Sequence, residues 1–480
     1  MHFGIDGRRR AAPSCEHRTA SATDAPEAPR ARFLAGLPLA GDPYAPETPI
    51  AQALKELIER YGHDGAFRGA IARVACDGLP ELSAIHTLEQ FYFYIDALVR
   101  WVPEVRRWEM DGREVHERTV YLRITQLYHY FNQPELEALQ SPIAPGAGVA
   151  LTPVSEWLRR FAVEWGAWLD TPASAARLGS FRYAPEYAWQ DYEQPPEAYE
   201  TFNAFFARRF RDIDTLRPVS NRADDRTIVF PAESTFVGQW AISTKVEGQM
   251  AADPSITVKH IRWSIRELLA DSAYADAFEG GLFCHSFLNT YDYHRLHAPV
   301  AGEVVEARFV PGQVYLQVEL KASEEGPLPN GNLPNAIIPT RYIDADDPTG
   351  YQFVQCRGLL VLKTERFGHV AVLPMGMAQV SSVVFTGPGP EHAPITLSPE
   401  EAHGLDYAGR VDAINAKLAR EVVGRRMEKG EMFSFFQFGG SDCVVVFERR
   451  ANVTVTAARG VHYPIRSQYA VATFNEDDGC

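Results

Sequence analysis

The spacing of apolar residues changes near Arg217-Pro218, and this change limits the fold of the chain more than any other feature. Upstream, apolar residues recur every three or four positions, the period of an amphipathic helix. Downstream, short β-rich runs are broken by glycine and proline, at 226–245, 281–289, 298–320, 351–375 and 378–386. The sequence therefore predicts an α+β protein, in which an N-terminal α-helical domain precedes a mainly antiparallel β-sheet domain.

Helix signals are strong in the first half of the chain. Thr48-Pro49 supplies an N-cap followed by proline in the first turn, and Thr87 with Gln90 forms a capping-box pattern. Helical periodicity follows in the segments 48–61, 91–102, 119–131, 154–169 and 197–211. The aromatic residues of these segments are more typical of a packed core than of a cofactor site. In the last segment we expect Arg208, Arg209 and Arg211 on the outer face.

The same patterns suggest domain boundaries. Residues 1–46 are rich in Ala, Pro, Arg and Ser and are predicted to be disordered. Residues 47–215 form the predicted helical domain, and residues 216–480 the predicted β-sheet domain. Within the second domain we expect a helix at 261–269 and another at 407–423, the latter in an insertion over about 387–426.

Composition restricts the function classes. The chain has 480 residues, 46% of them apolar, and a formal charge of −15, which argues against nucleic acid or an anionic membrane surface as the main partner. No apolar run approaches the roughly 20 residues of a spanning helix, and the N-terminus lacks the apolar core of a signal peptide. The six cysteines form no CxxC pair, so we expect a cytoplasmic protein and predict no metal site.

A short stretch near the C-terminus has two interpretations. Apolar runs at 432–438 and 443–447 predict strands, and between them Gly439-Gly440 precedes Ser441. Two glycines could hold the next peptide bond in a strained geometry, in which the serine hydroxyl attacks the preceding carbonyl. Gly-Gly and Gly-Ser are also common in hairpin turns. From these residues alone, the hairpin turn is the preferred interpretation.

Two other stretches contain reactive side chains. His294 and His297 lie three residues apart ahead of Ala298-Pro299, and they could be metal ligands, catalytic bases or packed structural groups. A metal site needs further ligands, which the sequence does not supply as a second histidine or cysteine pair. Glu233 follows a predicted strand, and a glutamate in such a place is usually a solvated charge.

Together, the three stretches resemble the phosphatidylserine decarboxylase family of pyruvoyl enzymes. Residues 438–441, Phe-Gly-Gly-Ser, are similar to the family's self-cleavage tetrapeptide, usually Leu-Gly-Ser-Thr, and residues 293–299 to its Tyr-His-Arg-x-His-x-Pro signature. The resemblance extends over about 200–470. Further similar elements are Lys429-Gly430-Glu431, Val310-Pro311-Gly312, and Lys259 with Trp263-Ser264 and Leu268-Leu269.

Within that family, the chain is most similar to the soluble branch typified by fungal L-tryptophan decarboxylase. The similar segments are 205–214, 287–289, the Phe-Gly-Gly-Ser site and the helical extension around Trp165-Gly166. Glu233-Ser234 stands where membrane-bound members have Asp-Gly, although this branch also has Glu-Ser there. The insertion at about 387–426 has no clear counterpart in the short bacterial enzymes.

The resemblance implies a mechanism. Ser441 would attack the Gly440 carbonyl, with His297 as base and Glu233 orienting it, and the chain would be cut into a β subunit, 1–440, and an α subunit, 441–480. Ser441 would become a pyruvoyl group that forms a Schiff base with a substrate amine and accepts the electrons released with CO2. His294 would act as an acid or contact the substrate carboxylate.

Several functions stay open on sequence alone. The first is decarboxylation of a soluble amino acid, for which the resemblance to this branch implies an aromatic one such as L-tryptophan. The second is decarboxylation of phosphatidylserine to phosphatidylethanolamine, for which Arg208, Arg209 and Arg211 could supply a basic patch. A serine hydrolase using Ser441, His297 and Glu233 lacks a G-x-S-x-G elbow, and an inactive β scaffold would not need the intact serine and histidines. The charge and the lack of a spanning segment favour a soluble substrate, and a homo-oligomer is compatible with the sequence.

Overall fold

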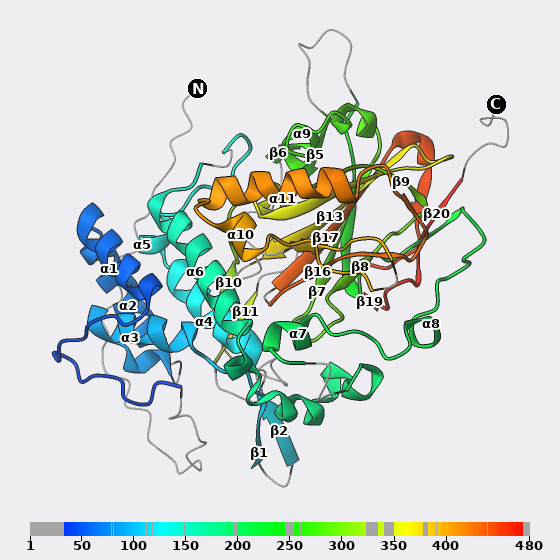
Figure 1. Cartoon of the computed structure of the whole chain (residues 1–480). Coiled ribbons are helices and arrows are strands. Elements are labelled where there is room, and N and C mark those ends of the chain that lie inside the picture. Colours follow the sequence, from blue (N-terminus) through cyan, green and yellow to red (C-terminus); the bar gives the residue numbers. More distant parts are fainter. Residues whose placement is uncertain are drawn as a thin grey trace, which may run out of the picture.

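The computed structural model of the chain describes residues 33–473, apart from 78, 80, 111–112, 118, 148–149, 195–198, 245–253, 259–260, 323–334, 340–349, 378–382, 390 and 439. Helices from the first third of the chain gather at one side of a large β-sheet, whose strands come from residues 234–463 (Figure 1). The architecture is α+β, as predicted from the sequence.

The helical region begins where the capping signals predict. Thr48 Oγ1 accepts a hydrogen bond from the Ala51 amide at 3.3 Å, and Thr87 and Gln90 form the predicted capping box. Both signals are therefore confirmed. The elements of this region are α1 (Pro49–Tyr61), α2 (Asp64–Cys76), α3 (Leu88–Val99), the hairpin β1 (Arg106–Met110) and β2 (Arg113–Glu117), α4 (Thr119–Phe131), α5 (Pro134–Glu137), α6 (Pro153–Leu169), α7 (Phe202–Phe206) and α8 (Ile213–Leu216).

Two helix predictions are wrong in extent or type. The helix predicted at 197–211 is the five-residue α7, whose last residue is Phe206. The helix predicted at 261–269 begins as strand β6 (Ile261–Ser264), because this segment pairs with β5 (Ser255–Val258). Only the four residues of α9 (Ile265–Leu268) are helical, with Ser264 as N-cap. Lys259, assigned to the same family element, lies outside the described residues.

The main sheet has eight strands in the order β15-β9-β12-β13-β17-β7-β4-β19, and all its pairings are antiparallel. Its strands are β4 (Ser234–Ala241), β7 (Leu282–Leu288), β9 (Gly302–Val310), β12 (Arg357–Lys363), β13 (His369–Met377), β15 (Arg426–Met427), β17 (Gly440–Phe447) and β19 (His462–Tyr463). Smaller sheets contain β3 (Thr227–Val229), β8 (Arg295–His297), β10 (Val318–Ala322), β11 (Asn335–Pro339), β14 (Val383–Phe385), β16 (Met432–Phe436), β18 (Val453–Val455) and β20 (Gln468–Ala472).

The strands on either side of the Gly-Gly-Ser stretch do not pair with each other. β16 lies in a three-stranded sheet between β14 and β8, whereas β17 lies inside the main sheet between β13 and β7. The hairpin interpretation is therefore wrong. The chain passes from one sheet to another between residues 436 and 440, and this passage brings His294, directly before β8, to the start of β17.

The insertion contributes α10 (Pro399–Ala402) and α11 (Tyr407–Glu421), and α11 lies across the main sheet in Figure 1. Asn415 of α11 accepts from the Phe309 amide at 2.7 Å and donates to the Phe309 carbonyl at 3.0 Å. The helix is thus fixed to β9 by a side chain that satisfies both backbone groups of one residue. None of the helices in the described parts of the chain has the length and apolar character needed to cross a membrane.

The apolar core is continuous across the predicted boundary at 215/216. Trp165 of α6 and Phe202 of α7 belong to the same buried cluster as Phe438 and the strands of the main sheet. At the other predicted boundary, Tyr44 donates to Asp96 of α3 at 2.8 Å. The helical region is therefore packed directly on the sheet that contains Ser441.

Candidate active site

Ser441 lies inside a strand. It is the second residue of β17 and is paired with Gly376 of β13 on one side and with Leu288 of β7 on the other. Its side chain is fully buried, and its Oγ lies 3.2 Å from Nδ1 of His294. The structure therefore brings the predicted nucleophile together with one of the two predicted histidines.

His294 is a buried, neutral histidine. Its ring stacks on Phe206 of α7 with the centroids 3.9 Å apart, and its backbone oxygen accepts from the Phe436 amide at 2.9 Å. Burial, and secondly the charge of Arg208, lowers the pKa of His294 to about 3. A neutral ring whose Nδ1 accepts from the Ser441 hydroxyl holds its own proton on Nε2. That Nε2 is buried and makes no hydrogen bond of regular geometry with a described residue, although the backbone of Thr290 and Asn289 beside the ring acts to raise its pKa.

His297 faces the opposite side of the same segment, because side chains alternate along an extended chain. Its Nδ1 lies 2.7 Å from the Gly430 carbonyl, and its Nε2 lies 3.3 Å from Oη of Tyr293. Since a carbonyl only accepts, Nδ1 holds the proton, and Nε of Arg466 donates to the same carbonyl at 3.0 Å rather than to the ring. Burial, and secondly the charge of Arg466, places the pKa of His297 well below its usual value.

Glu233, directly before β4, is held by an ion pair. Nε and Nη2 of Arg217 donate to its two carboxylate oxygens at 2.7 and 2.9 Å. Within the described part of the chain, no hydrogen bond joins Glu233 to His297 or His297 to Ser441. The triad implied by the resemblance is thus not assembled in the uncut chain, because Arg217 occupies the carboxylate and His297 faces away from the serine.

The helical region holds the segment that leads into the serine. Asn203 of α7 accepts from the Phe438 amide at 3.1 Å and donates to the Gly166 carbonyl of α6 at 3.1 Å. This bridge ties the chain upstream of Ser441 to two helices. The strained geometry predicted for Gly439-Gly440 involves Gly439, which lies outside the described residues. Aromatic rings within 5.5 Å of Phe438 are those of Trp165, Phe202 and Phe206.

Asp442 was not predicted from the sequence to be part of this region. It follows Ser441 directly and, by the alternation of the strand, faces the other side of the sheet. There its Oδ2 accepts from Oη of Tyr351 at 2.8 Å and lies 3.2 Å from Nε2 of His285. A carboxylate inside an apolar strand pattern needs such partners, and that pattern was the available signal.

Arg208 corrects a prediction. The sequence placed it on an outer helix face, but its side chain is 2% exposed. The reason is that α7 ends at Phe206, so the helical period no longer determines which way Arg208 points. No local pattern in the sequence signals this burial.

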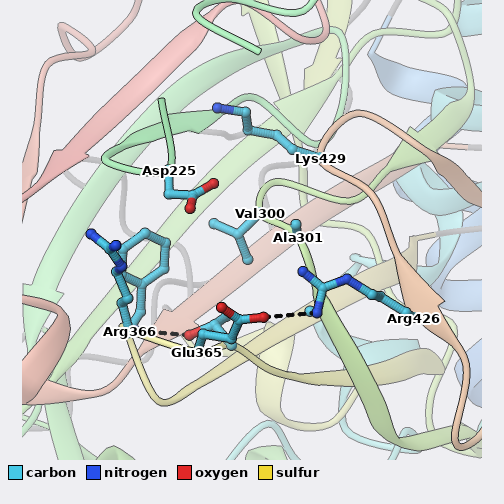
Figure 2. A pocket seen from close by; sticks show the side chains of 10 residues that line it. Asp225, Val300, Ala301, Glu365, Arg366, Arg426 and Lys429 are labelled. Carbon is cyan, nitrogen blue, oxygen red and sulfur yellow. Dashed lines mark hydrogen bonds and ion pairs between the residues drawn. The ribbon is translucent and has the colours of Figure 1, made fainter. Parts of the chain in front are cut away.

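Lys429, part of the family lead-in, has a structural role. Its Nζ donates to two backbone carbonyls of the turn before β3, both at 2.8 Å, and to the carbonyl of Thr227 at the start of β3, at 3.1 Å. Figure 2 shows the small pocket beside it, where Arg426 and Glu365 form an ion pair at 3.0 Å. The pocket holds about 40 Å³, room for a few water molecules but not for an amino acid. We therefore do not place a substrate there.

Comparison with known proteins identifies the family. The family model for phosphatidylserine decarboxylase matches residues 202–466, more than half of the 480 residues. The phosphatidylserine decarboxylase proenzyme of Fusobacterium nucleatum is 25% identical over 293 residues, covering 61% of this chain and 74% of that protein.

Shorter matches are more similar. The L-tryptophan decarboxylase of Psilocybe cyanescens is 30% identical over 194 residues, covering 40% of this chain and 41% of that protein. The phosphatidylserine decarboxylase proenzyme of Saccharophagus degradans is 36% identical over 124 residues, covering 26% and 39%. The chain thus spans less than half of these two relatives. The match over 202–466 includes both histidines, Glu233 and Ser441, and it shows that this chain belongs to the phosphatidylserine decarboxylase family of carboxy-lyases.

Proposed function

We propose that this chain is a self-processing, pyruvoyl-dependent decarboxylase that is cut between Gly440 and Ser441 and removes CO2 from an amino acid, with L-tryptophan as the first candidate. The observation that carries the proposal is the buried contact of 3.2 Å between Oγ of Ser441 and Nδ1 of His294. The names of two relatives, which call them proenzymes, support a cut of this kind.

The cut needs only groups of this chain and water. Oγ of Ser441 gives its proton to a neutral imidazole and attacks the carbonyl carbon of Gly440. The peptide C–N bond breaks as its nitrogen takes up a proton, which leaves an ester. Loss of the Cα proton of residue 441 expels the Gly440 carboxylate, and water then replaces the nitrogen, which leaves as ammonia. Residues 1–440 become the β subunit, and residues 441–480, capped by the pyruvoyl group, become the α subunit.

Two histidines are candidates for the proton acceptor. We propose His294, because its neutral Nδ1 already contacts the serine hydroxyl. The second candidate is His297 with Glu233, which the family resemblance favours. That pair would have to turn toward Ser441 and release Gly430 and Arg217 before the cut. Variants of the two histidines separate these candidates and are described in the Discussion.

The site fits a pyruvoyl group at position 441. The group replaces the serine at the same place in the chain, and the surrounding rings of Phe206 and Phe438 exclude water from it. The pyruvoyl group supplies a carbonyl system that bonds the substrate amine and accepts the electron pair released with CO2. His294, whose Nε2 makes no hydrogen bond of regular geometry with a described residue, is placed to hold a proton and return it to the substrate α-carbon.

The two chains are expected to stay together after the cut. β17 is hydrogen-bonded along its length to β13 and to β7, and both of these strands remain in the β subunit. The buried Asp442, with its contacts to Tyr351 and His285, adds a polar anchor at the second residue of the α subunit. The cleaved molecule is therefore one folded unit.

An amino acid is the first substrate candidate and phosphatidylserine is the second. The charge of −15 and the burial of Arg208 weaken the case for a basic, lipid-facing patch, and the match to the Psilocybe protein supports an aromatic amino acid. The family model and the Fusobacterium relative support the lipid equally well. A cytoplasmic enzyme fits the first candidate, and contact with a membrane surface would accompany the second.

The test is a substrate panel on protein whose cut has been verified by mass. CO2 release is measured from tryptophan, tyrosine and phenylalanine in detergent-free buffer, and from phosphatidylserine vesicles in parallel. The proposal expects turnover of a free amino acid. Turnover of vesicles alone would replace the substrate and keep the cut, whereas an uncut chain that releases CO2 would overturn the whole proposal.

A further inference from the structure

Arg208 is a buried cation with unused hydrogen-bond donors. Its Nη2 donates to the Tyr291 carbonyl at 2.5 Å, whereas Nε and Nη1 are buried without a partner among the described residues. No ion pair to a described acidic residue neutralises it. Leaving buried charged donors unpaired costs free energy, so such a group calls for a partner that the described residues do not supply.

A second buried arginine shows what a purely structural guanidinium looks like in this chain. Arg357 is 3% exposed, close to the 2% of Arg208. Its Nε, Nη1 and Nη2 all donate to backbone carbonyls, at 2.8, 2.7 and 2.9 Å. The two arginines are thus equally buried, but only Arg208 keeps donors open.

The open donors lie in the region of His294. Phe206, two residues before Arg208, stacks on the His294 ring, and the Tyr291 carbonyl that binds Arg208 is three residues before it. The Tyr192 ring fixes the guanidinium from one side, 4.2 Å from its carbon. Nε2 of His294 is a further buried donor that makes no hydrogen bond of regular geometry with a described residue. The unpaired donors of Arg208 therefore lie in the surroundings of the histidine that contacts Ser441.

We propose that Arg208 is a substrate-binding residue that holds the carboxylate that the site removes. The inference rests on the proposed decarboxylase function and extends it to a named contact. A guanidinium matches a carboxylate with two parallel hydrogen bonds, and a dry, aromatic surrounding strengthens them. Both candidate substrates, a free amino acid and the serine headgroup of a phospholipid, present this carboxylate, and their amine products lack it.

The experiment compares ligands that differ only in the carboxylate. Processed protein is first treated with borohydride, which reduces the pyruvoyl ketone and prevents turnover. Binding of tryptophan and of tryptamine is then measured by calorimetry for the unsubstituted protein, Arg208→Gln and the control Arg209→Gln. Arg209 is adjacent in sequence but uses Nη2 on the Glu391 carbonyl. We expect Arg208→Gln to weaken tryptophan binding about 10- to 100-fold and tryptamine binding less than about 3-fold. Arg209→Gln should change neither.

Equal losses for both ligands would assign Arg208 a structural role and overturn the inference, as would unchanged binding of tryptophan. If Arg208→Gln does not fold, Arg208→Lys replaces it, and a loss confined to tryptophan is again required. If the unsubstituted protein is cut but does not bind tryptophan, short-chain phosphatidylserine and phosphatidylethanolamine form the matched pair. A chain that is never cut removes the proposed function and this inference with it, and the mass of the protein shows that outcome separately.

Discussion

The two sides of the segment 294–297 offer a direct comparison, because one motif supplies a histidine to each. On one side, His294 contacts Ser441, and its Nε2 makes no hydrogen bond of regular geometry with a described residue. On the other side, both nitrogens of His297 lie within hydrogen-bond distance of described groups, Nδ1 of the Gly430 carbonyl and Nε2 of the Tyr293 hydroxyl. Both rings are buried, so burial does not separate them. The two rings differ in their partners, because only His294 contacts the hydroxyl of Ser441.

Removing Oγ of Ser441 should change the cut and the decarboxylase activity more than any other substitution. Ser441→Ala should remain one chain and be inactive, because alanine has no oxygen to attack the Gly440 carbonyl. Denaturing electrophoresis and a CO2 assay measure this. Ser434→Ala is the matched control, since Ser434 on β16 is equally buried. Two chains from Ser441→Ala would show that the cut lies elsewhere.

Substituting each histidine in turn tests which of the two accepts the proton of Ser441. His294→Gln should slow the cut by about 10²- to 10⁴-fold, the usual contribution of a general base, whereas His297→Gln should still be cut. The rate is followed by the appearance of the small chain after refolding or expression. The opposite result, a cut in His294→Gln and none in His297→Gln, would assign the base to His297. The uncut chain would then have to rearrange before it reacts.

Glu233→Gln tests whether Glu233 serves the stability of the fold or the cut. It removes the charge that pairs with Arg217, whose side chain is 18% exposed, and should lower the free energy of unfolding by about 1–3 kcal/mol. The cut should proceed at its normal rate, because Glu233 is bonded to Arg217 and not to a histidine. Chemical denaturation and the rate of the cut are measured together. Loss of the cut in a folded variant would support the triad implied by the resemblance.

Acid should lower the free energy of unfolding, and His294 should account for part of this dependence on pH. Its pKa is about 3 in the folded chain and about 6.5 when unfolded, so its contribution is complete above pH 6.5 and is lost as the pH falls toward 3. The loss is about 1.4 kcal/mol per pH unit within that window. Melting curves of the Ser441→Ala chain and of its His294→Gln double variant measure it.

His297, whose pKa is also lowered, adds to this loss of stability in acid. His462 opposes the loss, because its hydrogen bond to Asp292 raises its pKa. The difference between the two chains is therefore the quantity to compare, rather than the total slope. Parallel curves for both chains between pH 7 and about pH 4 would contradict the neutral, buried state of His294.

Much of the architecture follows from local patterns. The capping signals at Thr48 and Thr87 and the apolar periodicity of α4 and α6 predicted their helices closely, because each depends on residues within a few turns. The segment after Phe206 was not predictable in this way. Its direction depends on packing against 291–295, so the burial of Arg208 is a tertiary property.

Of the residues that the sequence predicts for the candidate site, the structure brings His294 to Ser441, whereas His297 and Glu233 are held by other partners. The sequence pattern marked Ser441, both histidines and Glu233, but the sheet crossing between β16 and β17 decides which histidine meets the serine. A spacing of three residues places the two rings on opposite sides of this segment because the segment is extended in the structure. Which side holds Ser441 follows only from pairings between strands distant in sequence, such as β17 with β7.

Mass analysis of the intact protein is the most direct test of whether the chain is cut between Gly440 and Ser441 and carries a pyruvoyl group. Purified protein, denatured and analysed by mass spectrometry, should give two chains that correspond to residues 1–440 and 441–480. The smaller should be lighter than the peptide that begins with Ser441 by the mass of one ammonia, and its N-terminus should be blocked to Edman degradation. A single chain with full decarboxylase activity, or a small chain that still begins with serine, would contradict the proposed cut and the proposed pyruvoyl group at residue 441.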